Sequence, residues 1–316
     1  MLSDLNRKDI SKNAAELGFV RDTFEKMSRL VRLLEYFERD PVLSRYLALK
    51  GGTAINLSIF KLPRLSVDID LDFAENLPLD EMKQKREIIR TTIRQFMSMH
   101  DYIYSEKSKA YHTLDSDVFQ YVNTGGVNDN IKVEINYSLR SHVLPLVKRP
   151  IETLGVFMPV EVLSLAPMEI FSAKISALLS RSAARDLYDV YNMITFGLFD
   201  DSQAEMLKKC VVFYTAVSSE ETPQDISLSK MDGLVFHDIR TKLIPMLRKK
   251  EKFDFAFARE RVREYLGTVL RLDENDKLFL SSFANGDYRP EFLFSGDKLA
   301  RVTSHPMALW KMRNRK

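Results

Sequence analysis

Cysteine is almost absent from this sequence of 316 residues, which contains only Cys210. A single cysteine cannot form an intramolecular disulfide, which excludes the small secreted folds held together by such bonds. Its neighbours Leu207, Val211 and Val212 are apolar, so we expect a buried thiol on a helix. The sequence also lacks a Cys/His cluster with metal-ligand spacing, a Walker loop and a GxGxxG motif.

Long apolar runs are also lacking. The first ten residues, MLSDLNRKDI, contain no apolar signal core. No stretch reaches the roughly 20 apolar residues that a membrane-spanning helix needs. A soluble cytoplasmic protein with no membrane partner is therefore expected. The 47 basic and 44 acidic residues leave a net charge of +3, which neither demands nor excludes a nucleic-acid partner.

The stretch Lys50–Phe73 carries the strongest local signal. It opens with Lys-Gly-Gly-Thr, in which Gly51 and Gly52 lack Cβ atoms and let the backbone turn sharply beside a ligand. Thr53 is expected to cap the helix that follows. The unpaired first amides of such a helix favour an anion. An ordinary strand–turn–helix corner has the same residues, so this turn alone does not identify a site.

Aspartates follow in a strand-like alternation. Asp68, Asp70 and Asp72 share one face of the stretch 67–73, and apolar residues take the other. Neighbouring carboxylates on one strand face lie about 6–7 Å apart. Where their oxygens converge to about 4 Å, they repel by about 4 kcal/mol at an effective dielectric constant of 20. A Mg²⁺ ion, which binds one or two carboxylates plus substrate phosphates, would remove that repulsion. The alternative is an edge strand with a solvated acidic face.

Taken together, KGGT, a helix and R-x-S-x-D-x-D resemble the nucleotidyltransferases of the DNA polymerase β superfamily. More narrowly, the pattern resembles the AbiEii/AbiGii-type toxin nucleotidyltransferases of bacterial toxin–antitoxin and phage-defence systems. The family's third acid corresponds to Glu134 in IKVEINYSL, whose alternative role is a surface ion pair with Lys132. The segment MEIFSAKISALLSRSAARDLYDVY resembles the narrower family's helical motif. It contributes Lys174, Arg185, Asp186 and Asp189, with Arg181 as a further positive charge nearby. The alternatives are a surface position for Lys174 and a purely structural salt-bridge role for Asp186 and Asp189.

The resemblance implies an α/β (α+β) fold. It combines a polymerase-β-like core and mixed β-sheet with N-terminal helices and a largely helical C-terminal domain. We expect residues 1–160 to form the helices and core, and residues 161–316 to complete the site and bind substrate. The implied catalytic residues are Asp68, Asp70, Glu134, Lys174 and Asp186, with Asp68 and Asp70 as metal ligands. The implied nucleotide-binding residues are Lys50, Gly51, Gly52, Thr53, Arg64, Ser66 and Lys174.

The implied activity is Mg²⁺-dependent transfer of NMP from an NTP to an acceptor, with Mn²⁺ as an alternative metal. The resemblance suggests an RNA 3′ end, notably tRNA, as the acceptor, and a cognate antitoxin as a partner. Basic residues between Arg240 and Arg263, and the tail from Arg301, suit such an acceptor but also suit a solvated surface. Two other functions remain open: transfer to a protein hydroxyl, and nucleotide binding without catalysis.

Apolar spacing predicts most remaining elements. Helices are expected within 4–39 and over Leu79–His100, Pro167–Ser180, Asp238–Lys250, Phe253–Leu270 and Glu274–Phe283, with another starting near Asp201. Strands are expected within 101–124 and over Ile131–Leu139. The basic residues of the helix Leu79–His100 form either a solvated face or a surface for a polyanion.

Overall fold

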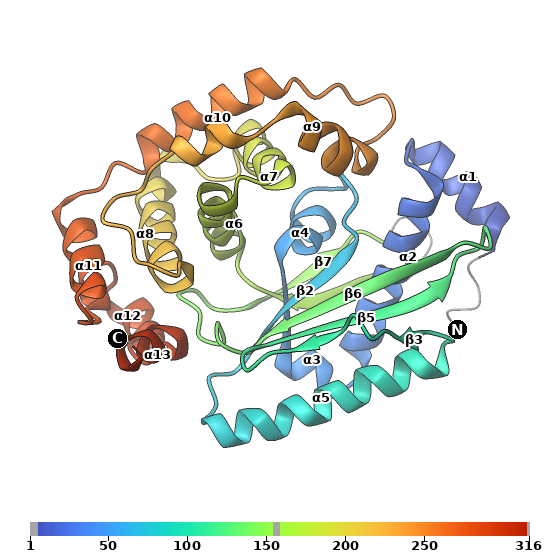
Figure 1. The fold of residues 1–316 in the computed structure, drawn as a ribbon, viewed down its shortest axis with the longest axis horizontal. Coiled ribbons are helices and arrows are strands. Elements are labelled where there is room, and N and C mark those ends of the chain that lie inside the picture. Colours follow the sequence, from blue (N-terminus) through green and yellow to red (C-terminus); the bar gives the residue numbers. More distant parts are fainter. Residues whose placement is uncertain (1–5, 154–158, 315–316) are drawn as a thin grey trace. The chain divides into compact units, whose positions relative to one another are not determined.

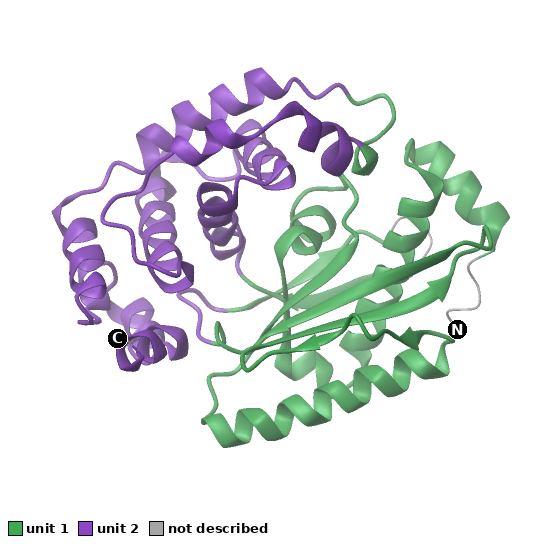
Figure 2. Ribbon diagram, viewed as in Figure 1, with its two compact units in different colours: residues 1–140, 146–165, 245–251 green, residues 141–145, 166–244, 252–316 purple. Residues whose placement is uncertain are grey.

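The computed structural model describes residues 6–153 and 159–314. These form two compact units, coloured separately in Figure 2. Unit 1 comprises Met1–Arg140, Leu146–Leu165 and Pro245–Glu251, and unit 2 comprises Ser141–Pro145, Ala166–Ile244 and Lys252–Lys316. Within the described ranges, no helix combines the length and apolarity needed to cross a lipid bilayer.

Unit 1 is built on a mixed β-sheet of eight strands within its described residues, ordered β3-β5-β6-β2-β1-β8-β7, with β4 beside β5. The strands are β1 Leu47–Lys50, β2 Asp68–Phe73, β3 Ile103–Tyr104, β4 Lys109–Ala110, β5 Leu114–Val122, β6 Asn128–Asn136, β7 Val147–Ile151 and β8 Val160–Ser164. β2 runs parallel to β6 and antiparallel to β1, whereas β1 runs parallel to β8. The mixed α/β class expected from the sequence is confirmed.

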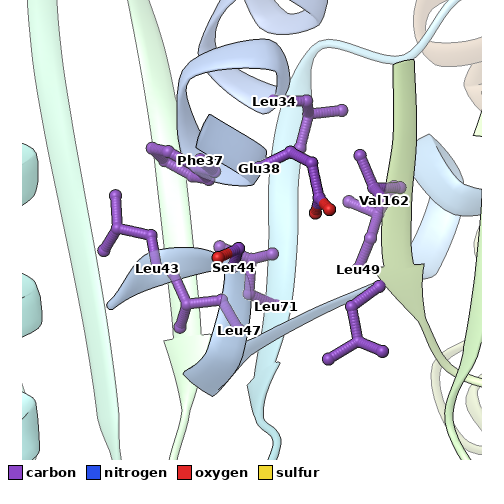
Figure 3. Close-up of a pocket in the computed structure, with 10 residues that line it drawn as sticks. Leu34, Phe37, Glu38, Leu43, Ser44, Leu47, Leu49, Leu71 and Val162 are labelled. Carbon is purple, nitrogen blue, oxygen red and sulfur yellow. The ribbon is translucent and has the colours of Figure 1, made fainter. Parts of the chain in front are cut away.

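Helices lie on both sides of this sheet, with α5 (Leu79–Met99) on one side and the short α4 (Gly51–Ala54) on the other (Figure 1). Unit 1 contains α1 Arg7–Leu17, α2 Arg21–Arg39, α3 Leu43–Tyr46, α4 Gly51–Ala54 and α5 Leu79–Met99, and a π-helical turn Ile55–Ile59 continues α4. Figure 3 shows Leu34 and Phe37 of α2 beside Leu49, Leu71 and Val162 around a small pocket. Leu71 lies between Asp70 and Asp72 on β2, so this apolar face is opposite the aspartates.

The basic face of α5 pairs with acids of the sheet. Arg86 Nη2 lies 2.7 Å from Asp115 Oδ1, and Arg94 Nη2 lies 3.2 Å from Asp117 Oδ1. Both aspartates belong to β5 and are almost fully buried. Arg86 and Arg94 therefore attach α5 to the sheet. These two arginines belong neither to a solvated face nor to a surface for a polyanion, the two roles expected from the sequence.

Unit 2 is helical in its described part. Its helices are α6 Pro167–Arg181, α7 Ala184–Thr195, α8 Asp201–Ser218, α9 Phe236–Asp238, α10 Phe255–Val269, α11 Glu274–Ala284, α12 Gly296–Val302 and α13 Pro306–Arg313. Pro167 occupies the first turn of α6, where its missing N–H costs nothing. Cys210 is buried within α8, as expected.

The expected helix over Asp238–Lys250 is wrong in its second half. A π-helical turn and a short 3₁₀ turn, Ile239–Leu243 and Ile244–Met246, follow α9. Leu247 then makes an isolated bridge with Arg64, and the Leu65 N–H donates to the Met246 carbonyl over 2.9 Å. The segment Pro245–Glu251 is therefore part of unit 1, because its backbone pairs with a loop distant in sequence.

A buried ion cluster joins α8 to α11. Lys208 Nζ lies 2.8 Å from Asp276 and 2.9 Å from Asp273, which together form the capping box of α11. Burial lowers the pKa of Lys208, but its hydrogen bonds with Asp276 and Asp273 outweigh burial and raise the pKa overall. Lys208 is therefore charged at neutral pH.

Replacing Lys208 by Met is expected to destabilise the protein by about 3–5 kcal/mol, because Asp276 is fully buried and would lose its counter-charge. Urea unfolding at pH 7 measures this loss. The matched control is Lys209→Met, which removes a looser pair with Glu205 at 3.5 Å and is expected to cost less than about 1 kcal/mol. Equal losses for the two variants would contradict the buried-pair argument.

Candidate functional site

Three side chains line up across the centre of the sheet. The β1–β2 register pairs Lys50 with Asp70, and the β2–β6 register pairs Asp70 with Glu134. Residues paired in register point to the same side of a sheet, so all three lie on the face opposite Leu71. We call this side the carboxylate face. It also carries Asp68, Asp72 and Lys132.

Gly51 lies directly against Asp70. Its φ is +65°, a left-handed conformation that side chains rarely adopt. A Cβ built at Gly51 would overlap Asp70 Oδ2 and lie 3.0 Å from Asp70 Cγ. The first glycine of the motif is therefore required by its backbone angle and by the close approach of this carboxylate.

The second glycine packs against a buried guanidinium. A Cβ at Gly52 would lie 2.8 Å from Arg64 Nη2. Arg64 is 2% exposed, and its Nη1 donates to the Leu65 carbonyl over 2.9 Å. The bridge to Leu247 fixes the same residue from the other side. Arg64, expected to bind nucleotide, is thus almost fully buried and packs against the second glycine of the turn.

Thr53 does not cap the helix, contrary to expectation. The helix begins at Gly51 with Lys50 at its N-cap, and no side chain caps it. The Thr53 hydroxyl lies 2.8 Å from Ser66 Oγ and also bonds the Asp68 carbonyl. The expectation failed because a hydroxyl that can cap a helix can equally bond a neighbouring strand. Thr53 and Ser66, both buried, tie the turn to the start of β2.

Lys50 is held by a carboxylate of the same face. Its Nζ lies 2.5 Å from Oδ1 of Asp72, a residue that is 2% exposed. The third aspartate of the alternation therefore neutralises a lysine. Asp68 and Asp70, the candidate metal ligands, are both half-buried.

The carboxylates of Asp68 and Asp70 suit a metal ion that takes only some of its ligands from the protein and the others from the substrate. Among the described residues, no group of three or more His, Cys, Asp or Glu side chains could hold an ion. The Asp68 carboxylate makes no hydrogen bond or ion pair to any described residue. Two neighbouring carboxylates fit Mg²⁺, which takes its other ligands from water and phosphate. Glu134 pairs with Asp70 in the strand register, and it also forms the expected ion pair with Lys132 at 2.8 Å.

Unit 2 holds the second group of candidate residues. Lys174 of α6 lies 2.9 Å from Asp186 and 3.2 Å from Asp189, both on α7. Arg181 Nε adds a contact of 2.9 Å to Asp186. Burial raises the pKa of Asp186, but the charge of Lys174 and the bond from Arg181 outweigh it and lower the pKa overall. The salt bridges considered from the sequence are thus present, and they fix the Lys174 ammonium.

Comparison with known proteins decides the family. A family model described as "Nucleotidyl transferase AbiEii toxin, Type IV TA system" matches residues 32–284. The chain belongs to the AbiEii nucleotidyltransferase toxin family. No curated protein matches the sequence. The resemblance read from KGGT and the aspartates is therefore confirmed, and the AbiEii-family chain is a nucleotidyltransferase.

A solved structure supports the fold of this AbiEii-family chain. MenT4, a nucleotidyltransferase toxin from Mycobacterium tuberculosis H37Rv, superimposes with a TM-score of 0.65 at 16% sequence identity. The match covers 96% of this chain and 99% of MenT4. At that identity the likeness concerns the fold, and the roles of individual residues are argued from their own geometry.

Sequence reasoning missed two parts of the AbiEii-family site. Met246 and Leu247 support the Arg64 loop, yet nothing in their local sequence signals this pairing. Ser116 pairs with Glu134 across β5 and β6, which extends the carboxylate row. The hairpin turn at Gly125–Gly126 could have revealed that register, because turn geometry fixes which residues of two strands pair.

Replacing Asp186 by Asn is expected to destabilise this AbiEii-family protein by about 3 kcal/mol at pH 7, because Lys174 and Arg181 lose a buried counter-charge. The folded-state pKa of Asp186 lies below its ordinary 3.8. The stability that the ionised Asp186 carboxylate contributes is therefore complete above pH 3.8, and it is lost as the pH falls through the folded-state pKa. Urea unfolding of the wild type and Asp186→Asn is measured from pH 7 to pH 3. The difference between their free energies of unfolding is expected to narrow only at the acid end. A difference that narrows above about pH 6 would contradict the assignment.

Proposed function

We propose that this protein is a divalent-metal-dependent nucleotidyltransferase that transfers NMP from an NTP to the 3′ end of an RNA, notably a tRNA. The observation that carries the proposal is the position of Asp70 between Gly51 and Glu134. One carboxylate there adjoins the glycine turn and a second acid. This combination suits a reaction that depends on positioning and charge stabilisation.

Asp68 and Asp70 would hold Mg²⁺, or Mn²⁺ in its place. When bound, the ion supplies Lewis-acid polarisation of the α-phosphate and neutralises charge on the pyrophosphate leaving group. The backbone amides of Gly51 and Gly52 would contact the phosphates. Arg64 packs against Gly52, and Thr53 bonds Ser66 and the Asp68 carbonyl, which holds the turn.

Glu134 would accept the proton of the attacking hydroxyl. Its carboxylate shares a row with Asp70 and is held by Lys132, with 27% of the side chain exposed. In unit 2, Asp186 and Asp189 position the ammonium of Lys174, and such a fixed cation suits a triphosphate. We assign catalysis to unit 1 and substrate binding to the helical unit 2, whose bounds differ from the expected 1–160 and 161–316 because Pro245–Glu251, for example, belongs to unit 1.

An RNA acceptor is supported by the exposed basic side chains of both units. Lys249 and Lys250 in unit 1, and Arg240 and Lys252 in unit 2, are exposed. Cations spread over a surface suit a phosphate backbone. The family description also names a type IV toxin–antitoxin system, which supports a cognate antitoxin as partner.

Labelling with each of the four NTPs tests the acceptor. Purified protein is incubated with a labelled NTP, Mg²⁺, total RNA and lysate protein, and the products are divided between nuclease and protease. We expect label that nuclease removes, that maps to RNA 3′ ends, and that chelation by EDTA abolishes. Label that survives nuclease and disappears with protease would overturn the RNA acceptor in favour of a protein hydroxyl.

A further inference from the structure

The carboxylate row continues beyond Glu134. Glu134 pairs with Ser116 of β5, and Ser116 pairs with Lys109 of β4. At about 4.8 Å per strand, Lys109 lies roughly 14 Å from Asp70 along this row. Lys109 is exposed and makes no hydrogen bond or ion pair through its side chain to the described residues.

A neighbouring row of the same face carries amides. Asp68 pairs with Lys132, and two residues farther along β6 Asn130 pairs with Gln120 of β5. Gln120 in turn pairs with Ile103 of β3. Asn130 and Gln120 are both exposed, and within the described chain neither amide group bonds a partner. Ile103 is 68% exposed.

The opposite side of these strands has a different character. There Asp115 and Asp117 are buried and bonded to α5, and Phe119 is fully buried. The two faces of β5 and β6 therefore differ, although Ser116 on the carboxylate face is also buried. One packs against helices, and the other presents amides, a lysine and isolated apolar side chains to solvent beside the carboxylates.

We propose that the acceptor RNA lies across this open part of the carboxylate face, with its 3′ end at Asp68 and Asp70. The inference rests on the proposed function. Lys109 contacts a phosphate, while Asn130 and Gln120 bond the edges of unpaired bases, and Ile103 packs against a base face. Amides offer both donors and acceptors, and single-stranded RNA is read by such groups on open sheets. Continuity with the carboxylates and the positive charge of Lys109 favour RNA over an acidic peptide.

The test compares Asn130→Ala/Gln120→Ala with the wild type in steady-state transfer to RNA. Losing two hydrogen bonds is expected to raise the KM for RNA about tenfold. The kcat at saturating RNA and the KM for NTP are expected to stay within about twofold of wild type, because neither amide belongs to the nucleotide site. Lys109→Gln is expected to reduce the slope of log affinity against log salt by about 0.7, as for one lost phosphate contact on a single strand.

Gln84→Ala/Gln95→Ala is the matched control, because both glutamines are exposed on α5, which packs on the other face. Its KM for RNA is expected to equal that of the wild type. If the wild type labels RNA and the face variants keep its KM and salt slope, the docking surface is overturned and the proposed function stands. If the wild type labels only protein, both are overturned.

Discussion

Replacing Asp70 by Asn is expected to lower nucleotidyl transfer roughly a thousandfold, since one lost metal carboxylate removes about 4 kcal/mol of transition-state stabilisation. Asp68→Asn is expected to have the same effect. For Asp68→Asn the amide keeps the volume of the side chain, and the Asp68 carboxylate makes no ion pair with a described residue, so the free energy of unfolding is expected to change little. Transfer of labelled NMP to RNA, with urea unfolding measured in parallel, checks both statements.

The control for these variants is Asp80→Asn. Asp80 is exposed in the first turn of α5 and has only a distant contact, 3.8 Å, with Lys83. It is expected to retain full activity. Asp68→Asn or Asp70→Asn protein that transfers NMP at the wild-type rate would defeat the assignment of these carboxylates as metal ligands.

Gly51→Ala is expected to lower transfer at least about a hundredfold, because its methyl group would displace the Asp70 carboxylate. A shift of about 1 Å in a catalytic group costs activity on that scale. Alanine at a φ of +65° also costs roughly 1–2 kcal/mol of stability. Rates with labelled NTP and thermal unfolding separate the two effects.

Gly126→Ala isolates the backbone strain. Gly126 has a φ of +81° in the β5–β6 turn, and a Cβ there would meet nothing within 4 Å. The Gly126→Ala protein is expected to lose about as much stability as Gly51→Ala and to keep its transfer activity. If Gly126→Ala lost as much activity as Gly51→Ala, strain in the fold rather than contact with Asp70 would explain the effect.

Much of the fold follows from short-range patterns. The alternation around Asp68 and Asp70 predicts a strand, and β2 spans Asp68–Phe73. The apolar spacing of 79–100 predicts a helix, and α5 spans Leu79–Met99. Such patterns succeed because helices and strands repeat over a few residues, and burial of one face selects between them.

Pairing between distant segments could not be predicted in this way. The resemblance placed Glu134 near the aspartates, but only the β2–β6 register shows that it lies beside Asp70. Likewise, the burial of Arg64 depends on Gly52 and Leu247, which lie on opposite sides of it in the sequence. Local propensity carries no information about such partners, so the sequence alone does not show which segments Arg64 contacts.

The bridge between Arg64 and Leu247 also has a consequence for synthesis of the toxin. A chain emerging from the ribosome has its glycine turn and both aspartates long before it has Met246 and Leu247, which close the loop behind them. Contacts so far apart in sequence form late, after the intervening chain is available. A nascent or prematurely terminated toxin would lack the pairing of Met246 and Leu247 with the Arg64 loop. The complete site would therefore assemble only after these residues have been translated.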